Sequence, residues 1–496
     1  MKNKKVSPDK FTRREFIGRT TAAAAGLIIL PGNVIGGLGH TPPSDKLNIA
    51  AIGVGEGGKG KVNLENIVGQ NIVALCDVDW DYAAPVFKIY PKATLYKDYR
   101  VMLENQKDID AVVIATPDHS HYLPAAMAMK MGKHVYVQKP LTHSIWEARE
   151  LTRLNRICGV ATQMGTEGHS SDTVRELTEL IQSGVIGEIR EVHTWTNRPI
   201  WPQGMDRPVK KYKIPKTLEW DLFLGSAPYR PYHPAYTPWN WRGWWDFGTG
   251  ALGDMGCHIL DVPFFALKLG WPISFEASSS PVNIESAPVA SRVEYIFPER
   301  DNLPYLPLPE VKLIWHDGGL MPPRIEGLPD GQLMGGWGGG NLFIGSRGKI
   351  VCEDYGNNYK IYPKDLSYNK PPATYERIPD HPLGGGRHEM DWVRACKESP
   401  ESRKKPASDF ELAGPLTEMV IAGNLAIRLQ GLQRKLKWDG PNMKITNIGP
   451  EEKLTQLTTH TNYKNDKWTA WLNLNTREVN ALETADEWIN HKYREF

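Results

Sequence analysis

The sequence predicts an α/β protein: an N-terminal domain built on a parallel sheet, then a C-terminal α+β domain with an open, mostly antiparallel sheet. Two observations predict this class. Short apolar runs alternate with helix-length stretches from Leu47 to Met164, as in parallel sheets covered by helices on both faces. After Thr166 this alternation stops, and a series of strand-like runs follows. A chain of 496 residues is long enough for two or three such domains.

Residues 1–39 are expected to form an export leader. Basic residues, among them the adjacent Arg13 and Arg14, precede a short apolar run from Thr20 to Leu30. The run is about half the ~20 residues that a spanning helix needs. The segment resembles a twin-arginine signal, which implies the twin-arginine export machinery as a partner and a periplasmic location. The alternative is a basic tail on a cytosolic protein.

The charge, hydropathy and cysteine content of the sequence exclude several classes of protein and of site. Without the leader the chain is weakly acidic, so nucleic acid, which needs a basic patch, is not an expected partner. The mean hydropathy of -0.43 excludes a polytopic membrane protein. Five widely spaced cysteines form no C-x-x-C pair, so neither a metal site nor a disulfide framework is predicted, and folding in a reducing cytoplasm before export is favoured.

Residues 44–166 are predicted to bind a nucleotide. Strands are expected at Leu47–Gly53, Asn71–Asp77, Ala111–Thr116, His134–Val137 and Val160–Met164. The first strand runs into a G-x-G-x-x-G turn, whose candidate cofactor-binding residues are Gly53, Gly55, Glu56, Gly57 and Gly58. Glycines there let backbone N–H groups approach a pyrophosphate at a helix N-terminus.

Asp77 ends the second expected strand, about 20 residues beyond the glycines, where a carboxylate can bind a ribose hydroxyl. The same carboxylate would repel a 2′-phosphate. The sequence therefore predicts a Rossmann domain that binds NAD rather than NADP. A glycine-rich turn with a capping aspartate and no ligand is the alternative.

Further polar groups follow later strands, and the carboxyl ends of strands line the binding crevice of α/β sheets. The additional candidates for the cofactor site are Thr116, Pro117, His119, His121, Gln138 and Lys139. Lys139 has two interpretations: a solvated lysine at a strand end, or a cation held beside the nicotinamide.

A helical segment beginning near Gly250 carries Asp254 and His258, four residues apart and therefore on one helix face. The carboxylate could orient the imidazole. Taken singly, a histidine in an apolar helix is more often a core residue, and Asp254 could be a helix cap. The combination favours a catalytic pair.

These motifs resemble the Gfo/Idh/MocA oxidoreductases from Leu47 to about Asn447. The resemblance implies that Lys139 is the lysine of the family's E-K-P motif and that Asp254 and His258 form its D-x-x-x-H motif, with His258 removing a hydroxyl proton. It also implies that Thr116, Pro117 and His121 lie below the nicotinamide. One departure is Gln138, which replaces the glutamate of E-K-P.

Residues 167–447 are expected to form the substrate and oligomerisation domain, and the resemblance implies a homo-oligomer through its sheet. Strand-like runs are Arg190–Asn197, Ser274–Ser280, Ser291–Phe297, Val311–Trp315 and Asn341–Cys352, with helices at 173–182 and 409–429. Tryptophans crowd the segment before the candidate catalytic helix, and indole faces suit sugar rings as well as an ordinary aromatic core. The candidate substrate-binding residues are Arg198, Trp201, Trp241, Arg242, Trp245 and Asp246. Residues 448–496 form an extension without a predicted role.

The favoured function is an exported dehydrogenase with bound NAD that oxidises a ring secondary hydroxyl of a sugar or glycoside, C3 being suggested by exported relatives. His258 would be the base, Asp254 its orienting group and Lys139 the cation beside the alkoxide. A redox-neutral glycosidase that acts through a 3-keto intermediate is the first alternative; it needs an extra acid, for which Tyr212, Tyr229 and His233 are candidates. A non-catalytic sugar-binding protein is the second.

Overall fold

The computed structural model describes residues 45–300, 306, 308–459, 475–490 and 493–494. The chain divides into two compact units, residues 1–46 and 47–496. The expected leader, residues 1–39, lies outside the described residues. Among the residues that are described, no helix combines the length and the apolar character needed to cross a membrane.

The first part of the second unit is a six-stranded sheet in which every pair of neighbouring strands is parallel. The strand order is β3-β2-β1-β4-β5-β6. The strands are β1 (Asn48–Ile52), β2 (Asn71–Cys76), β3 (Thr94–Tyr96), β4 (Ala111–Ile114), β5 (His134–Val137) and β6 (Thr162–Met164). Five of them lie where the sequence predicts strands; β3 was not predicted.

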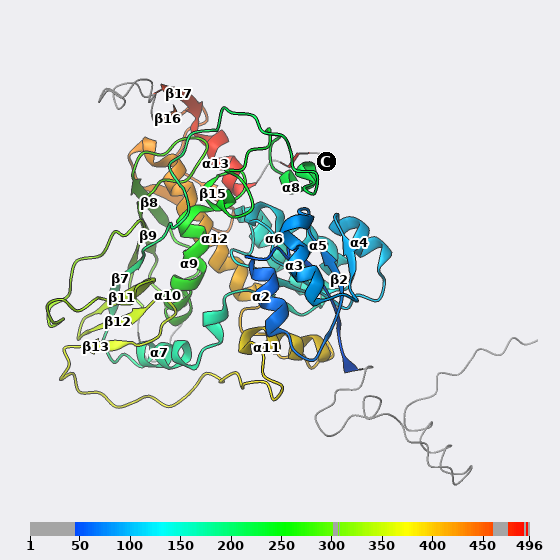
Figure 1. The fold of residues 1–496 in the computed structure, drawn as a ribbon. Helices are drawn as coiled ribbons and strands as arrows, with labels where there is room; N and C mark the ends of the chain where they lie inside the picture. Colours follow the sequence, from blue (N-terminus) through cyan, green and yellow to red (C-terminus); the bar gives the residue numbers. More distant parts are fainter. Residues whose placement is uncertain (1–44, 301–305, 307, 460–474, 491–492, 495–496) are drawn as a thin grey trace, which may run out of the picture. The chain divides into compact units, whose positions relative to one another are not determined.

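Helices join these strands, as the alternating pattern predicts (Figure 1). They are α2 (Lys59–Asn66), α3 (Trp80–Ile89), α4 (Tyr99–Asn105), α5 (Tyr122–Lys130) and α6 (Ile145–Cys158). Helix α6 shows why its bounds fall where they do. Ser144 and Glu147 form a reciprocal capping box at its start, and Gly159 ends it with a left-handed φ of 62°.

The second part contains a nine-stranded sheet of order β13-β12-β11-β7-β10-β9-β8-β14-β15. Its strands are β7 (Ile189–Thr196), β8 (Ser274–Ser279), β9 (Ser291–Phe297), β10 (Val311–His316), β11 (Gly339–Gly345), β12 (Lys349–Glu353), β13 (Lys360–Tyr362), β14 (Leu436–Asp439) and β15 (Lys444–Ile445). Only the β7–β10 pair is parallel, so the prediction of a mostly antiparallel sheet is confirmed. The single strand expected at Asn341–Cys352 is the hairpin β11–β12, because the chain turns between Gly345 and Gly348.

The helices that follow β6 and precede the C-terminal extension are α7 (Asp172–Gln182), α8 (Trp220–Leu224), α9 (Gly250–Ile259), α10 (Asp261–Ala266), α11 (Arg387–Lys397) and α12 (Phe410–Leu429). Helix α12 is buried along almost its whole length and packs against α6, α9 and β8. It therefore fixes α9, which carries Asp254 and His258, to the nucleotide-binding part of the chain (Figure 1).

The described residues of the C-terminal extension form two strands and a helix. Strands β16 (Lys453–Thr459) and β17 (Asn475–Asn480) form an antiparallel pair, and α13 (Ala481–Ile489) packs against α12 and α6. Trp488 of α13 is buried, with its ring 5.1 Å from that of His143 and 5.2 Å from that of Trp245. The extension thus joins the core that carries the site.

Candidate functional site

A cavity of about 440 Å³ lies at the carboxyl ends of the parallel strands. One wall comes from residues that follow β1, β2, β4 and β5, and the other from α9, Tyr355 and residues 198–201 and 237–242. Ligands of α/β sheets bind at this edge. Its volume lies within the usual range of small-molecule and cofactor sites.

The glycine turn brings the start of α2 to the cavity. Gly53 has a φ of 80°, and a Cβ there would lie 2.7 Å from the carbonyl oxygen of Ala115. A Cβ on Gly60 would lie 2.1 Å from the oxygen of Gly53, so α2 crosses β1 closely only because both residues are glycines. Helix α2 begins at Lys59, and its first N–H groups have no acceptor within the helix, which fits a pyrophosphate.

Tyr82 of α3 lies against the same turn. A Cβ on Gly55 would come within 2.0 Å of the Tyr82 ring, and the Gly57 N–H donates to the Tyr82 hydroxyl over 3.1 Å. Gly55 and Gly57 were predicted from the sequence as cofactor-binding residues, whereas Gly60 and Tyr82 were not. Gly60 could have been predicted because it continues the series of closely spaced glycines after Gly53. No feature of the sequence predicted Tyr82.

Asp77 lies at the end of β2 and lines the cavity. Its carboxylate accepts hydrogen bonds from the N–H groups of Val54 (2.8 Å) and Asp79 (2.9 Å). Burial raises the pKa of Asp77 to about 6, against the opposing effect of these backbone donors. Each carboxylate oxygen has a second lone pair for a ribose hydroxyl. The glycine cradle, the start of α2 and Asp77 together fit a dinucleotide.

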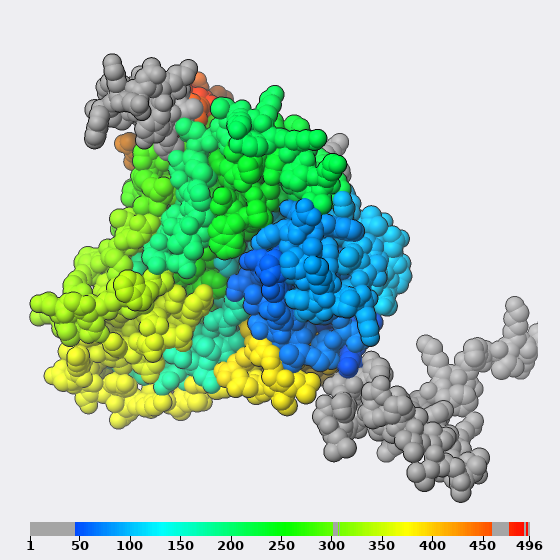
Figure 2. Space-filling view, in the orientation of Figure 1, coloured from blue at the N-terminus to red at the C-terminus, as the bar shows by residue number. Residues whose placement is uncertain are grey.

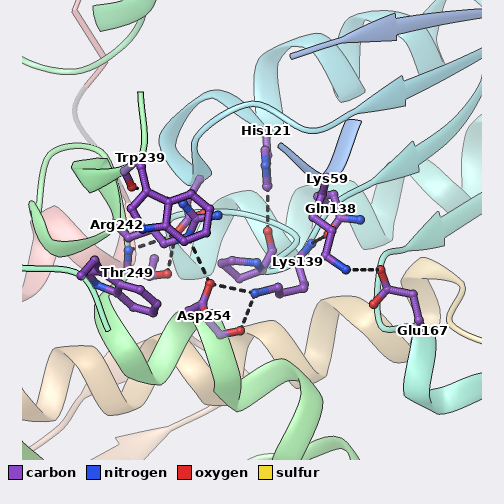
Figure 3. Close-up of polar contacts among 12 residues, drawn as sticks. Lys59, His121, Gln138, Lys139, Glu167, Trp239, Arg242, Thr249 and Asp254 are labelled. Atoms are coloured by element: carbon purple, nitrogen blue, oxygen red, sulfur yellow. Dashed lines mark hydrogen bonds and ion pairs between the residues drawn. The ribbon is translucent and has the colours of Figure 1, made fainter. Parts of the chain in front are cut away.

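Lys139, Asp254 and Arg242 form a charged cluster in the cavity. The Lys139 ammonium donates to the Asp254 carboxylate over 2.9 Å and to its backbone oxygen over 2.6 Å, and Arg242 Nε donates to the same carboxylate oxygen over 3.3 Å (Figure 3). Burial raises the pKa of Asp254, but the charges of Lys139 and Arg242 outweigh it and lower the pKa to about 2. One carboxylate thus holds two cations.

His258 follows one turn later on α9 and lines the same cavity. Its side chain is buried, and its Nδ1 has no hydrogen-bond partner among the described residues. Burial, followed by the charge of Lys139, lowers the pKa of His258 to about 3. The imidazole is therefore neutral at physiological pH and can accept a proton. Its ring centroid is 5.0 Å from that of Tyr355, a residue that sequence analysis missed.

The expected orienting contact between Asp254 and His258 is not formed. Within the described part of the chain no hydrogen bond joins the two side chains, because the Asp254 carboxylate is turned to Lys139 and Arg242. Helical spacing places the two residues on one face but does not choose between the partners of the carboxylate. In this structure the Asp254 carboxylate therefore contacts Lys139 and Arg242 and not His258.

Gln138 lies at the buried edge of the cavity. Its amide nitrogen donates to Asn63 over 2.8 Å, and Asn63 donates to Glu389 of α11 over 2.8 Å. A Cβ on Gly165 would lie 2.6 Å from that amide nitrogen, so the glycine leaves the space that Gln138 fills. The neutral amide takes part in a buried hydrogen-bond chain in place of a carboxylate.

Thr116 and Pro117 line the cavity, but His119 and His121 do not. The His121 ring nitrogens lie 2.8 Å from the oxygens of Pro140 and Thr116. His121 thus ties the turn after β4 to the turn that carries Lys139. The ring nitrogens of His119 lie 3.0 Å from the Phe223 oxygen and 3.3 Å from the Phe247 oxygen. Both were predicted to contact the cofactor; in this structure their rings lie against backbone oxygens and do not line the cavity.

Among the expected substrate-binding residues, Arg198, Trp201, Trp241 and Arg242 line the cavity. The Arg242 guanidinium lies 4.1 Å from the ring centroid of Trp239 and 4.3 Å from that of Trp241. Trp239 also lines the cavity and was not named from the sequence, although it belongs to the tryptophan-rich segment. A wall of indoles around a fixed cation can bind a hydroxylated ring.

Three expected ligands point elsewhere. Trp245 is buried against Trp488 and donates to the Asn283 oxygen over 3.2 Å, and Asp246 pairs with Arg230. Glu56 pairs with Lys61 over 2.7 Å. None of the three lines the cavity, because neighbouring residues in a turn or a 3₁₀ segment point in different directions. The acids considered for a glycosidase, Tyr212, Tyr229 and His233, do not line it either.

Two domain families match the sequence and together cover just over half of it. Residues 47–166 match the oxidoreductase family NAD-binding Rossmann fold of the Gfo/Idh/MocA proteins. Residues 170–300 match the C-terminal alpha/beta domain of the same oxidoreductase family. The NAD-binding prediction for the first domain is confirmed.

Curated relatives are similar at low identity. A D-glucoside 3-dehydrogenase of Escherichia coli is 30% identical over 232 residues, 46% of this chain and 56% of the relative. A glycosyl hydrolase family 109 protein of a Shewanella strain is 32% identical over 186 residues, 34% of this chain and 38% of the relative. An uncharacterised oxidoreductase of Synechocystis is 26% identical over 44% of this chain and 50% of the relative. The chain spans about half the length of these relatives, or less.

Solved structures share the fold. The WlbA dehydrogenase of Bordetella pertussis, solved with NADH and UDP-GlcNAcA, has a TM-score of 0.52 and 15% identity over 79% of this chain and 99% of that one. The aldose-aldose oxidoreductase of Caulobacter crescentus, solved with glycerol, has a TM-score of 0.50 and 15% identity over 79% of this chain and 99% of that one. With both domain families matched in order and the two-domain fold in common, the chain belongs to the Gfo/Idh/MocA oxidoreductases.

Proposed function

We propose that this protein is an exported oxidoreductase that keeps NAD bound and oxidises a ring secondary hydroxyl, C3 being the first candidate, of a sugar or glycoside. The observation that carries the proposal is the pairing of a neutral, buried imidazole on His258 with the fixed ammonium of Lys139 in one cavity. A proton acceptor and a cation are the two protein groups that alcohol oxidation needs.

In the proposed oxidation, His258, Lys139 and Asp254 each have a separate role. His258 accepts the hydroxyl proton, and Lys139 stabilises the oxygen that becomes negative as the proton leaves. Asp254 holds Lys139 at that position through the 2.9 Å contact, and Arg242 donates to the same carboxylate oxygen over 3.3 Å. Bound NAD supplies the acceptor for the hydride from the same carbon. The products are a ketone, NADH and a protonated His258.

A sugar substrate is favoured by the cavity wall and by the relatives. Trp201, Trp239 and Trp241 present indole groups beside Arg198 and Arg242, and flat apolar faces with polar edges suit pyranose rings. One relative is named a D-glucoside 3-dehydrogenase, which supports the C3 position.

Export with a bound cofactor is supported by the leader and by the cysteines. All five cysteines are free, four of them buried, as expected of a protein that folds under reducing conditions. Outside the cytoplasm no NAD pool would replace a lost cofactor. The hydride must then leave the bound cofactor to a second carbonyl substrate or another acceptor.

A redox-neutral glycosidase is the second candidate, because relatives of glycosyl hydrolase family 109 match this chain. It requires an acid near the leaving group, and Tyr355 beside His258 is the described tyrosine placed for that role. Burial raises the pKa of Tyr355, so its phenol is protonated but is a weaker acid than an exposed tyrosine.

The test uses the purified full-length protein. Acid release measures bound nicotinamide, and a panel of aryl and alkyl glycosides is then added without an external acceptor while NADH absorbance and sugar products are followed. A single turnover to NADH and a keto-sugar supports the dehydrogenase. Repeated release of aglycone without net NADH selects the glycosidase, and neither signal with any sugar overturns both.

A further inference from the structure

Residues 217–226, here called the cover segment, run beside the end of β2 that carries Asp77. The Trp80 N–H donates to the Thr217 oxygen over 3.2 Å, and the Glu219 N–H donates to the Val78 oxygen over 2.9 Å. Glu219 also pairs with Lys97 over 2.6 Å. The cover segment is thus attached to the strand end that fits the adenosine ribose.

The second half of the cover segment walls the cavity. Its residues Leu222, Phe223, Gly225 and Ser226 are part of the lining. His119 bonds to the Phe223 oxygen over 3.0 Å, and the Ser226 hydroxyl donates to the His119 oxygen over 3.3 Å. Figure 2 shows this green part of the chain lying against the blue nucleotide-binding part. A nucleotide held by Asp77 would therefore lie beneath the cover segment.

The C-terminal end of the chain fastens this segment from the other side. Arg494 pairs with Asp221 over 2.8 Å, its guanidinium donates to the Gly225 oxygen over 3.1 Å, and its N–H donates to the Ser226 oxygen over 3.0 Å. Three contacts from one residue thus fix the lining residues Gly225 and Ser226.

The fastening residue is itself anchored on the nucleotide-binding part. The Tyr493 hydroxyl donates to Glu147 of α6 over 2.6 Å, and α13 is buried through Trp488 against His143 and Trp245. The extension therefore connects α6 to the cover segment. Its contacts act on the backbone that borders the cavity and not on the reacting groups.

We propose that the C-terminal extension is a clasp that retains NAD by holding the cover segment over the nucleotide end of the cavity. The inference rests on the retained cofactor of the proposed function. Arg494 and Asp221 are positioning residues: they set how fast the nucleotide leaves and leave the hydride-transfer groups unchanged. A clasp of this kind suits a protein that cannot rebind NAD once it is exported.

The test times cofactor release from full-length protein reconstituted with NAD. Wild type, Arg494→Ala and Asp221→Asn are passed through desalting columns after increasing delays, and the remaining nicotinamide is measured by acid release. Both variants should lose the cofactor about three- to tenfold faster than wild type, consistent with the loss of charge-assisted hydrogen bonds. Arg477→Ala, an exposed position on β17 of the same extension, is the matched control and should release NAD at the wild-type rate.

A merely structural role is separated by a second measurement. The clasp predicts faster release together with an unchanged melting temperature of the NAD-free protein. Release at the wild-type rate from both variants overturns the proposal, whether or not the melting temperature falls. Because no sugar is present, the result is independent of the substrate, and failure of the sugar assay leaves this test intact.

Discussion

At the residue scale, Lys139 is the cation on which the proposed chemistry depends. Lys139→Ala removes the ammonium that Asp254 holds, so the developing alkoxide loses its charge partner. We expect kcat to fall about 100- to 1000-fold, as for loss of one oxyanion-stabilising group, while bound NAD stays at the wild-type level. Single-turnover NADH formation and acid-released nicotinamide measure the two quantities. Lys61→Ala, which removes a lysine paired with Glu56 outside the cavity, is the control, and full activity of Lys139→Ala would contradict the assigned role.

His258 gives a pH dependence whose sign follows from its environment. A general base works in its neutral form, and burial together with Lys139 lowers the pKa of His258 from its ordinary 6.5 to about 3. Activity is then lost only as the pH falls toward that low value. We expect kcat/KM to stay nearly constant from about pH 7 down to about pH 5. An acid limb with an inflection near 6.5 would show that the base is an unperturbed histidine, against this assignment.

Sequence spacing was enough to single out Lys139, Asp254 and His258, because motif residues at strand ends and one helical turn apart must come near one edge of a sheet. It was not enough to assign partners. Asp254 was paired with its helical neighbour, whereas the structure turns it to Lys139, which is 115 positions away in the chain. Tyr355 and Tyr82 also line the cavity, and they come from separate parts of the chain. No local sequence pattern predicts that such residues belong to the site.

At the element scale, the burial of α13 predicts that this helix contributes to the free energy of unfolding. Trp488 is 3% exposed and packs its indole on His143 and Trp245. Trp488→Ala should lower the free energy of unfolding by about 3–5 kcal/mol, the usual cost of deleting a buried tryptophan. Urea denaturation followed by circular dichroism measures the change. Trp337→Ala is the matched control, because Trp337 is 86% exposed; equal stability of the two variants would mean that α13 is not part of the cooperative core.

Most elements could be predicted because their patterns are local. The strand at Ala111–Ile114 is a continuous apolar run, the strand at His134–Val137 is apolar after its first residue, and β9 shows the alternation of a strand with one buried face. Strand β3 has only three residues, largely exposed, and so leaves no such pattern. The expected catalytic helix is two helices, α9 and α10, which meet at Leu260; both halves are apolar, so periodicity alone did not show the break.

At the scale of the whole molecule, the classes of the two domains could be predicted from the sequence. The contacts that later segments of the chain make with the first domain could not. Helix α11 contributes Glu389 to the Asn63 and Gln138 hydrogen bonds, and the extension reaches α6 through Tyr493. Such contacts join residues hundreds of positions apart. They depend on surface complementarity, which composition and periodicity do not report.

The last prediction concerns where the molecule is loaded with its cofactor. The proposed leader contains Arg13 and Arg14, and a twin-arginine route exports folded proteins, so NAD must enter in the cytoplasm before transport. Arg13→Lys with Arg14→Lys keeps the charge but removes the recognised pair. We expect this double variant to stay in the cytoplasmic fraction with the same bound nicotinamide per chain as exported wild type. Immunoblots of cell fractions and acid release measure location and loading.

Lys4→Arg with Lys5→Arg, an equally conservative change in the same leader, should be exported normally. Two results would count against the proposal: export of the Arg13 and Arg14 variant at the wild-type level, or wild-type protein that reaches the periplasm without nicotinamide. The second would also remove the need for a clasp, because retention is useful only if the cofactor is bound before export. Location and retention are therefore linked: a cofactor that cannot be replaced outside the cytoplasm must be held by the fold itself.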